Sequence, residues 1–197
     1  MEITLGPLGI TWAGNRGGAA LVAPYGSGLE EAVERGNVFA TANQTTVTTQ
    51  AGLSATTPAL TIANRNGSGQ RVKVWYVSCT SLVAAGAAAA IFAALGRKHG
   101  TAVTETTAAT VANMKTGDAS APQGIACLAV ATLPAAPVAI GILGAQTTAA
   151  ITTGPVGSFF ERWYNGALFI DEGCNFSLQS STASTFFCEY IFEVVAK

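Results

Sequence analysis

Charged side chains are scarce in this 197-residue sequence: Asp, Glu, Lys and Arg make up 11% of it, and the formal net charge is −1. Soluble domains usually carry roughly 25% charged residues. Between residues 100 and 160 the only charged side chains are Glu105, Lys115 and Asp118. Such a surface fits burial against neighbouring molecules, and it equally fits a surface kept wet by Thr, Ser and Asn.

Long basic clusters are lacking as well. The densest positive group, Arg97, Lys98 and His99, lies between two glycines, as in a solvated turn. This group is too short to follow a phosphate backbone. We therefore expect no nucleic-acid partner.

The features of export and membrane insertion are also missing. Residues 1–14 have no basic start, long apolar centre or small-residue cleavage site, so we expect no Sec-dependent export. Residues 125–143 are apolar over the length of a membrane span, but Pro134 and Pro137 interrupt them. Two strands joined by a PAAP turn explain this segment better, and we expect no membrane partner.

The sequence has a single histidine, His99, which excludes most familiar catalytic sets. Metal-dependent oxygenases built on a β-barrel need two or three His and a carboxylate. A Ser/His/Asp triad would have to use His99, yet no G-x-S-x-G motif accompanies it. Phosphate-binding glycine loops are absent too. We predict no catalytic residue, no metal site and no cofactor.

Acidic residues gather near the C-terminus, which raises the alternative of a glycosidase with paired carboxylates. The group comprises Glu161, Asp171, Glu172, Glu189 and Glu193. Asp171 and Glu172 precede Gly173, as in a turn, while Glu189 and Glu193 alternate along a strand pattern. We expect surface carboxylates and a protein that is not an enzyme.

The four cysteines lie far apart, each in an apolar, strand-like run, and form no CxxC or Cys/His pattern: Cys79, Cys127, Cys174 and Cys188. Because proteins that are not exported mature in a reducing compartment, we predict buried free thiols.

What the sequence does contain is a succession of β-strand patterns, rich in Thr, Val and aromatics and separated by Gly, Pro and Asn. They cover residues 37–44, 46–50, 59–64, 71–83, 89–96, 125–132, 138–146, 167–171, 175–181 and 186–195. The last alternates clearly, with Cys188, Tyr190, Phe192 and Val194 on one face. We predict an all-β, jelly-roll β-sandwich over residues 37–197, with a barrel as the alternative.

Residues 1–36 are Gly-rich and poor in core-forming side chains, so we predict an extended N-terminal arm with a short helix at its end. Ser27 and Glu30 match a capping box, and Gly36 matches a left-handed helix stop. Residues 72–79 and 138–144 are apolar on both strand faces. We expect the arm, loops or another subunit to cover their outer side.

Trp163, Tyr164 and Asn165 form the one group that resembles a ligand site, because aromatic rings can stack on a sugar while Asn bonds its hydroxyls. Aromatics are equally enriched at the ends of sandwiches and at subunit interfaces, which we consider the better explanation. We expect Trp12 to be an anchor in the arm and Trp75 to be a core residue.

Two stretches, GNVFATANQTTVTTQAGLSATTPALTIANRNGSGQRVKVWYVS and LFIDEGCNFSLQSSTASTFFCEYIFEV, resemble a family of tailed-bacteriophage structural proteins. The family has an RGN-x-F-x-A-x-NQ entry, then a T-T-x-x-L hairpin with Asn-Pro and GSG, and a PPG turn before its last strands. The likeness covers about residues 35–83 and 165–196. Here Arg65 and Asn66 replace Asn-Pro, and DEG replaces PPG. We expect a hairpin loop at Asn66-Gly67 and a polar turn at DEG.

This resemblance implies a jelly-roll virion protein that decorates or cements the phage head, acting by binding. The low charge, the strands apolar on both faces and the Gly-rich arm fit an oligomer, and we expect a homotrimer. We expect it to be assembled in the host cytoplasm and to contact the major capsid protein or other virion proteins at the capsid surface. Two alternatives remain open: a receptor- or glycan-binding head of a fibre or spike, and a coat protein that tiles the shell as a single jelly roll.

Overall fold

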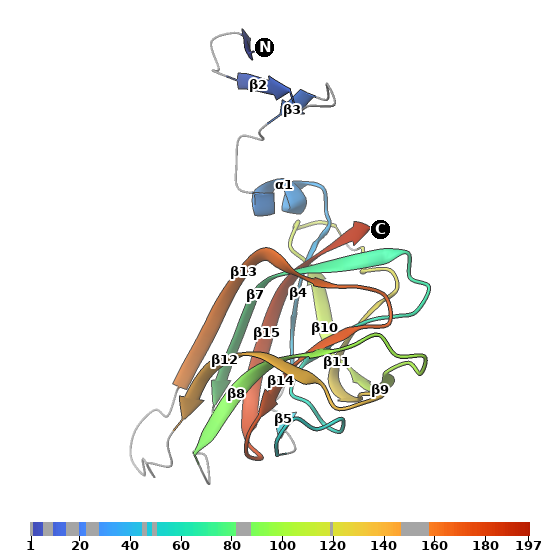
Figure 1. Cartoon of the computed structure of the whole chain (residues 1–197), viewed down its shortest axis with the longest axis vertical. Coiled ribbons are helices and arrows are strands. Elements are labelled where there is room, and N and C mark those ends of the chain that lie inside the picture. Colours follow the sequence, from blue (N-terminus) through green and yellow to red (C-terminus); the bar gives the residue numbers. More distant parts are fainter. Residues whose placement is uncertain are drawn as a thin grey trace.

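The structure, a computed structural model, describes residues 2–5, 10–14, 20–22, 28–44, 47–48, 51–81, 88–118, 120–146 and 158–197. Two antiparallel sheets pack face to face, so the predicted all-β sandwich is confirmed (Figure 1). Strands occupy every segment for which the sequence shows a strand pattern.

The sheet that we name the β15 sheet runs through β10 (Thr110–Asn113), β4 (Val38–Ala42), β15 (Thr185–Ala196), β7 (Gln70–Ser81) and β13 (Ser158–Ile170), with β5 (Val47–Thr48) also paired to β15. The opposite sheet, the β14 sheet, runs through β12 (Val138–Gln146), β8 (Ala89–Gly96), β14 (Asn175–Ser180), β6 (Thr61–Asn64), β11 (Ile125–Thr132) and β9 (Thr104–Ala108). Both sheets therefore contain strands from distant parts of the sequence.

Eight of these strands pair in a nested order, in which the first strand in the sequence pairs with the last and the middle two pair with each other. Counting only β4, β6, β7, β8, β12, β13, β14 and β15, the first strand pairs with the eighth and the second with the seventh. The third strand pairs with the sixth and the fourth with the fifth. The other three strands of this region, β9, β10 and β11, come between β8 and β12 in the sequence and extend the sheets beyond β4 and β6.

This pairing overturns the hairpin predicted at Asn66-Gly67. The turn itself is present, with Gly67 at a φ of +74°. However, it joins β6 to β7, which belong to opposite sheets. The turn that follows β13 also connects the two sheets, and the two turns meet where the Gly69 N–H donates to Glu172 Oε1 at 2.7 Å. Each turn therefore carries the chain from one sheet to the other.

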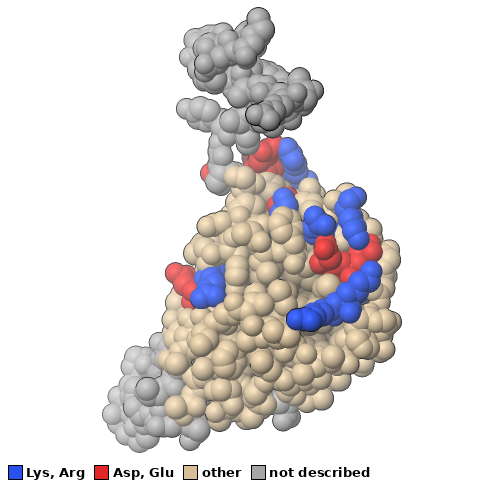
Figure 2. All heavy atoms as spheres, in the orientation of Figure 1, with Lys and Arg blue, Asp and Glu red and all other residues tan. Residues whose placement is uncertain are grey.

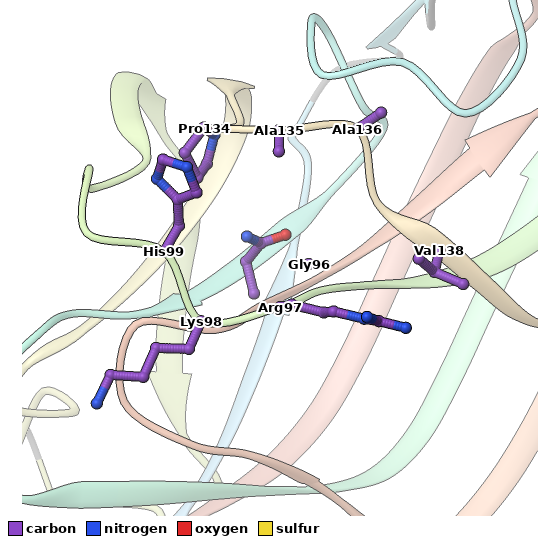
Figure 3. A pocket seen from close by; sticks show the side chains of 9 residues that line it. Gly96, Arg97, Lys98, His99, Pro134, Ala135, Ala136 and Val138 are labelled. Carbon is purple, nitrogen blue, oxygen red and sulfur yellow. The ribbon is translucent and has the colours of Figure 1, made fainter.

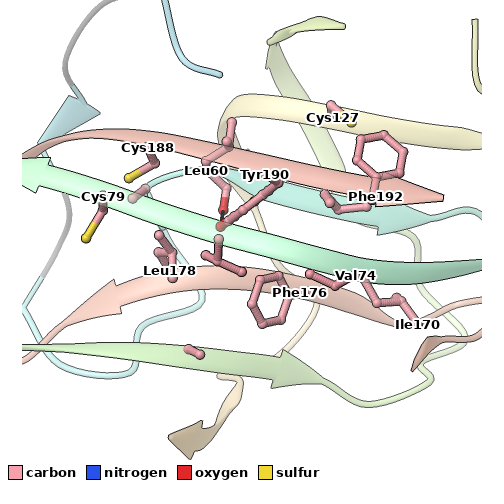
Figure 4. Packing of buried hydrophobic residues seen from close by; sticks show 14 of the residues in the cluster. Leu60, Val74, Cys79, Cys127, Ile170, Phe176, Leu178, Cys188, Tyr190 and Phe192 are labelled. Carbon is pink, nitrogen blue, oxygen red and sulfur yellow. Dashed lines mark hydrogen bonds between the residues drawn. The ribbon is translucent and has the colours of Figure 1, made fainter. Parts of the chain in front are cut away.

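The core lies between the two sheets and shows the predicted alternation of β15 (Figure 4). Cys188, Tyr190 and Phe192 are buried and face the β14 sheet. The Tyr190 hydroxyl donates to the backbone carbonyl of Leu60 at 2.5 Å, and its ring packs edge-on against Phe176 with centroids 5.4 Å apart. The side chain of Tyr190, on the β15 sheet, thereby bonds the backbone just before β6 of the β14 sheet.

Residues 1–36 contain a separate small sheet of β1 (Glu2–Leu5), β2 (Ile10–Gly14) and β3 (Ala20–Val22), followed by α1 (Gly28–Glu34) (Figure 1). Gly36, which follows the helix, has a φ of +72° and donates its N–H to Val33 O at 2.8 Å. The next N–H, of Asn37, donates to Ala32 O at 3.1 Å, which completes a Schellman stop. Ser27, the predicted cap, lies outside the described residues. The division between arm and domain at residue 36 stays a prediction.

Candidate interaction surface

β13 contains a bulge at the predicted ligand residues. Trp163 pairs with Tyr76 of β7 and Leu168 with Val74, so residues 164–167 of β13 face the single residue Trp75. Asn165 and Gly166 reach this conformation with φ angles of +52° and +74°. The sequence predicted a strand only from residue 167, because an Asn-Gly pair is typical of a turn. Here the pair instead forms the bulge of a longer strand.

Trp163 and Tyr164 are consecutive residues of β13 and lie on opposite faces of the β15 sheet. Trp163 is on the outer face, 52% exposed, with its ring centroid 4.7 Å from that of Tyr76. Tyr164 packs into the core edge-on to Phe176, and its buried hydroxyl has no hydrogen-bond partner among the described residues. Asn165 is exposed at the bulge. The structure therefore does not bring the three predicted residues together in one site.

Trp75 is not the core residue that we expected. β7 also has an extra residue opposite β15, because Tyr76 pairs with Ile191 and Val74 with Phe192. Both Trp75 and Tyr76 consequently lie on the outer face. The half-buried indole donates from Nε1 to Glu193 Oε2 at 3.3 Å. Its ring covers part of the outer face next to α1, where it approaches Gly28.

The carboxylates of the outer face are held by neighbouring side chains. Glu161 on β13 and Glu189 on β15 both pair with Ser78 of β7. The Tyr76 hydroxyl donates to Glu161 Oε2 at 2.9 Å, and burial together with this bond raises the pKa of Tyr76. Both glutamates are surface groups, as predicted. The prediction is wrong for Glu193, which is only 7% exposed and accepts from the Lys73 ammonium at 3.2 Å and from the Trp75 indole.

Large exposed apolar side chains concentrate on three strands. Nine such side chains lie in the described part of the chain, and seven of them are on β12, β13 and β15: Val138, Ile140, Ile142, Phe159, Trp163, Phe169 and Phe187. We call this set the apolar surface. β12 and β13 are edge strands of opposite sheets, and the Arg162 guanidinium of β13 donates to Ile142 O of β12 at 2.8 Å. Most of the apolar surface therefore follows one edge of the sandwich.

Charged side chains are sparse over much of the surface, although Glu161 and Arg162 lie beside Trp163 on β13. Figure 2 shows one face of the molecule, where charged groups gather mainly toward the end that carries α1 and a broad area has none. The charge deficit seen in the sequence is thus also a feature of the folded surface.

Residue types that serve in metal binding or catalysis in other proteins do not cluster in the described part of the chain. The described residues contain no group of three or more His, Cys, Asp and Glu positioned to hold a metal ion. His99 Nδ1 accepts the Thr101 N–H at 3.0 Å in an exposed turn. Likewise, none of the described helices has the length and apolar character needed to cross a membrane.

All four cysteines are free thiols, as predicted, with Cys79, Cys127 and Cys188 buried and Cys174 half-buried. Burial raises the pKa of Cys79 and of Cys127 to about 12, so both thiols are protonated and poorly nucleophilic at neutral pH.

Comparisons with protein-family models, curated proteins and solved structures give no match. Interpretation of the surface therefore depends on its residues and geometry.

Proposed function

We propose that this chain is a non-enzymatic structural protein of a bacteriophage virion, a decoration or cement protein that binds the head as an oligomer. Its fold supports this proposal through strand order. The first strand pairs with the eighth, the second with the seventh, the third with the sixth and the fourth with the fifth, as expected of a long hairpin wrapped into two sheets, and this order supports a jelly roll. This fold is common in capsid proteins.

The apolar surface is the observation that carries the proposal. Its seven side chains expose 37–58% of their area. Since an aromatic side chain has roughly 150–250 Å² and aliphatic ones somewhat less, together they expose about 600 Å². These side chains belong to strands of both sheets, so the total is divided between the β12–β13 edge and the outer face of the β15 sheet and is not one continuous patch. It approaches the roughly 800 Å² that each partner contributes to a standard interface.

A second copy of this chain is the occupant that we propose for the β12–β13 edge, in a homotrimer. The remaining outer face then contacts the major capsid protein. Several such contacts made at once on a lattice strengthen one another through effective concentration. A protein that binds only the assembled shell stabilises it by mass action.

Charge substitution on the apolar surface tests this proposal. Ile142 is 56% exposed on β12, so an Ile142→Asp variant should fold normally while losing self-association and head binding. Leu53, which is 37% exposed and outside the apolar surface, supplies the matched control Leu53→Asp. Sedimentation velocity and co-sedimentation with purified heads measure the two effects. A trimer unchanged by Ile142→Asp, or a wild-type monomer without affinity for heads, contradicts the proposal.

Copy number per particle, from a quantitative gel, separates the alternatives. Decoration requires a number fixed by the capsid lattice alongside a separate major capsid protein. A shell coat of this chain would have no other major capsid protein. A few copies at the tail would instead favour the fibre or spike head.

One observation favours that second candidate: Trp163 presents an exposed ring on the outer face, next to Tyr76, which bonds the Glu161 carboxylate. A flat ring beside a carboxylate is suited to stacking on a sugar and bonding its hydroxyls. Loss of host or glycan binding in Trp163→Ala, with particles otherwise intact, would support it over head decoration.

A further inference from the structure

Two buried amide side chains on the same strand differ in a way that points to a binding site. Asn175 and Gln179 both lie on β14 and are each 1% exposed. Gln179 is fully bonded: Oε1 accepts the Ser54 N–H at 3.3 Å, and Nε2 donates to Ser54 O at 3.3 Å and to Ser177 Oγ at 3.2 Å. Asn175 is the opposite case, because neither Nδ2 nor Oδ1 has a partner among the described residues.

Buried polar groups are nearly always hydrogen-bonded, since an unpaired amide in a protein interior is destabilising. Asn175 therefore needs an explanation that Gln179 does not. The Asn175 side chain faces Gly96 of β8, where an added Cβ would collide with the amide. The absence of a side chain at Gly96 makes room for the Asn175 amide.

Asn175 lines a pocket of about 130 Å³ formed by two chain segments. One is the segment 133–137, which connects β11 to β12 across the intervening strands β6, β14 and β8. Four strand spacings amount to roughly 19 Å, so five residues cross this distance only when nearly extended. The PAAP sequence thus joins two strands, as predicted, but these strands are not neighbours in the sheet. The other segment is 96–99, at the end of β8.

Two cationic side chains, Arg97 and Lys98, line this pocket together with His99, and no Asp or Glu does. Figure 3 shows His99 beside Pro134 at one end and Arg97 extending below Val138 at the other, while Lys98 points away from the 133–137 segment. Within the described part of the chain, neither Arg97 nor Lys98 forms an ion pair. Because His99 Nδ1 accepts the Thr101 N–H, the neutral ring carries its hydrogen on Nε2 and is a donor there.

We propose that this pocket binds a carboxylate that lies next to a peptide N–H, as at the end of a polypeptide chain or in an N-acylated amino acid. Asn175 Nδ2 donates to a carboxylate oxygen, and Asn175 Oδ1 accepts the neighbouring peptide N–H. Arg97 supplies the balancing charge. An amide offers one donor side and one acceptor side, which is the complement of this group. The proposal stands independently of any role in a virion.

N-acetylglycine is the simplest probe that carries both groups, and N-acetylglycinamide is its uncharged counterpart. We expect N-acetylglycine, titrated into the full chain, to shift the amide resonances of residues 96–99 and 175 in an NMR spectrum. We expect N-acetylglycinamide to bind at least about tenfold more weakly, because a hydrogen bond to a charged group is stronger than one to a neutral group. Equal binding of the two probes, or no shift with either, overturns the proposal.

Three variants distinguish ligand binding from a structural role. Asn175→Ala should bind N-acetylglycine at least about tenfold more weakly, yet unfold at the same temperature as wild type or higher, since it removes an unpaired amide. Gln179→Ala, the matched control, should unfold at a lower temperature and keep its affinity. Arg97→Gln should weaken binding and reduce its dependence on salt. Undiminished binding in both Asn175→Ala and Arg97→Gln overturns the proposal.

A protein chain and a free small acid are the two possible sources of this chemistry. Comparing N-acetylglycine with a pentapeptide that ends in glycine distinguishes them. Tighter binding of the pentapeptide indicates a protein chain end, and equal binding indicates a small acid. Exclusion of the pentapeptide, with N-acetylglycine still bound, likewise assigns the pocket to a small acid.

Discussion

The hydrogen bond between Tyr190 and Leu60 offers a sharp test of how the two sheets are held together. In Tyr190→Phe the ring stays in the core and only the hydroxyl is lost. Leu60 O keeps a second donor, the Leu178 N–H at 3.3 Å, so the carbonyl is not left wholly unpaired. The loss should therefore be near that of one neutral hydrogen bond, about 1 kcal/mol in the free energy of unfolding. For a chain of about this size, that lowers the melting temperature by roughly 2–4 °C.

Tyr164 provides the matched control, because its hydroxyl is equally buried but has no partner among the described residues. Both rings pack against Phe176. Tyr164→Phe should leave the free energy of unfolding unchanged or raise it. Urea unfolding at a fixed protein concentration measures both variants, since self-association would otherwise change the apparent stability. Equal destabilisation by the two substitutions would refute the reasoning, because it would show that the bond to Leu60 is not what distinguishes them.

Three further predictions concern other parts of the sandwich. Because the pKa values of Cys79 and Cys127 rise from 9.0 to about 12 on folding, stability is full below pH 9 and falls between pH 9 and 12, where only the unfolded thiols ionise. The free energy of unfolding should drop there by up to about 1.4 kcal/mol per pH unit for each thiol, and a Cys79→Ala variant with an unchanged slope would contradict this. Glu193→Ala, which leaves the Trp75 indole without its acceptor, should lower the free energy of urea unfolding by about 1–3 kcal/mol, and an unchanged value would count against this bond. Gly166→Ala should cost about 1 kcal/mol in thermal unfolding, because Gly166 has a φ of +74° and its added Cβ would lie 3.4 Å from the Trp75 ring; a neutral result would show that the bulge can relax.

The candidate sites were only partly predictable. The scarcity of charged residues and the strands that are apolar on both faces predicted an exposed apolar surface. Both features can be read from the sequence, because the alternation of side chains is a local property of a strand. Sequence could not distinguish Asn175 from Gln179, because both occur in the same strand pattern. What separates them is the loop that lies over each, Ser54 above Gln179 and the 133–137 segment above Asn175.

The bulge at residues 164–167 shows a second limit. Consecutive residues of a regular strand point to opposite faces, but the extra residue of β7 opposite this bulge puts Trp75 and Tyr76 both on the outer face. An Asn-Gly pair is compatible with either a turn or a bulge, and only the pairing with β7 decides between them.

The sequence alone determined where most of the sandwich strands lie, which face of β15 is buried, and that charge is too scarce to cover the surface. These features depend on residues close together in the chain, whose periodicity and turn types act locally. The tertiary structure decided which sheet each strand joins, because β4 meets β15 across almost the whole length of the domain. Such pairings depend on burying both sheets against each other, and no local pattern encodes that choice.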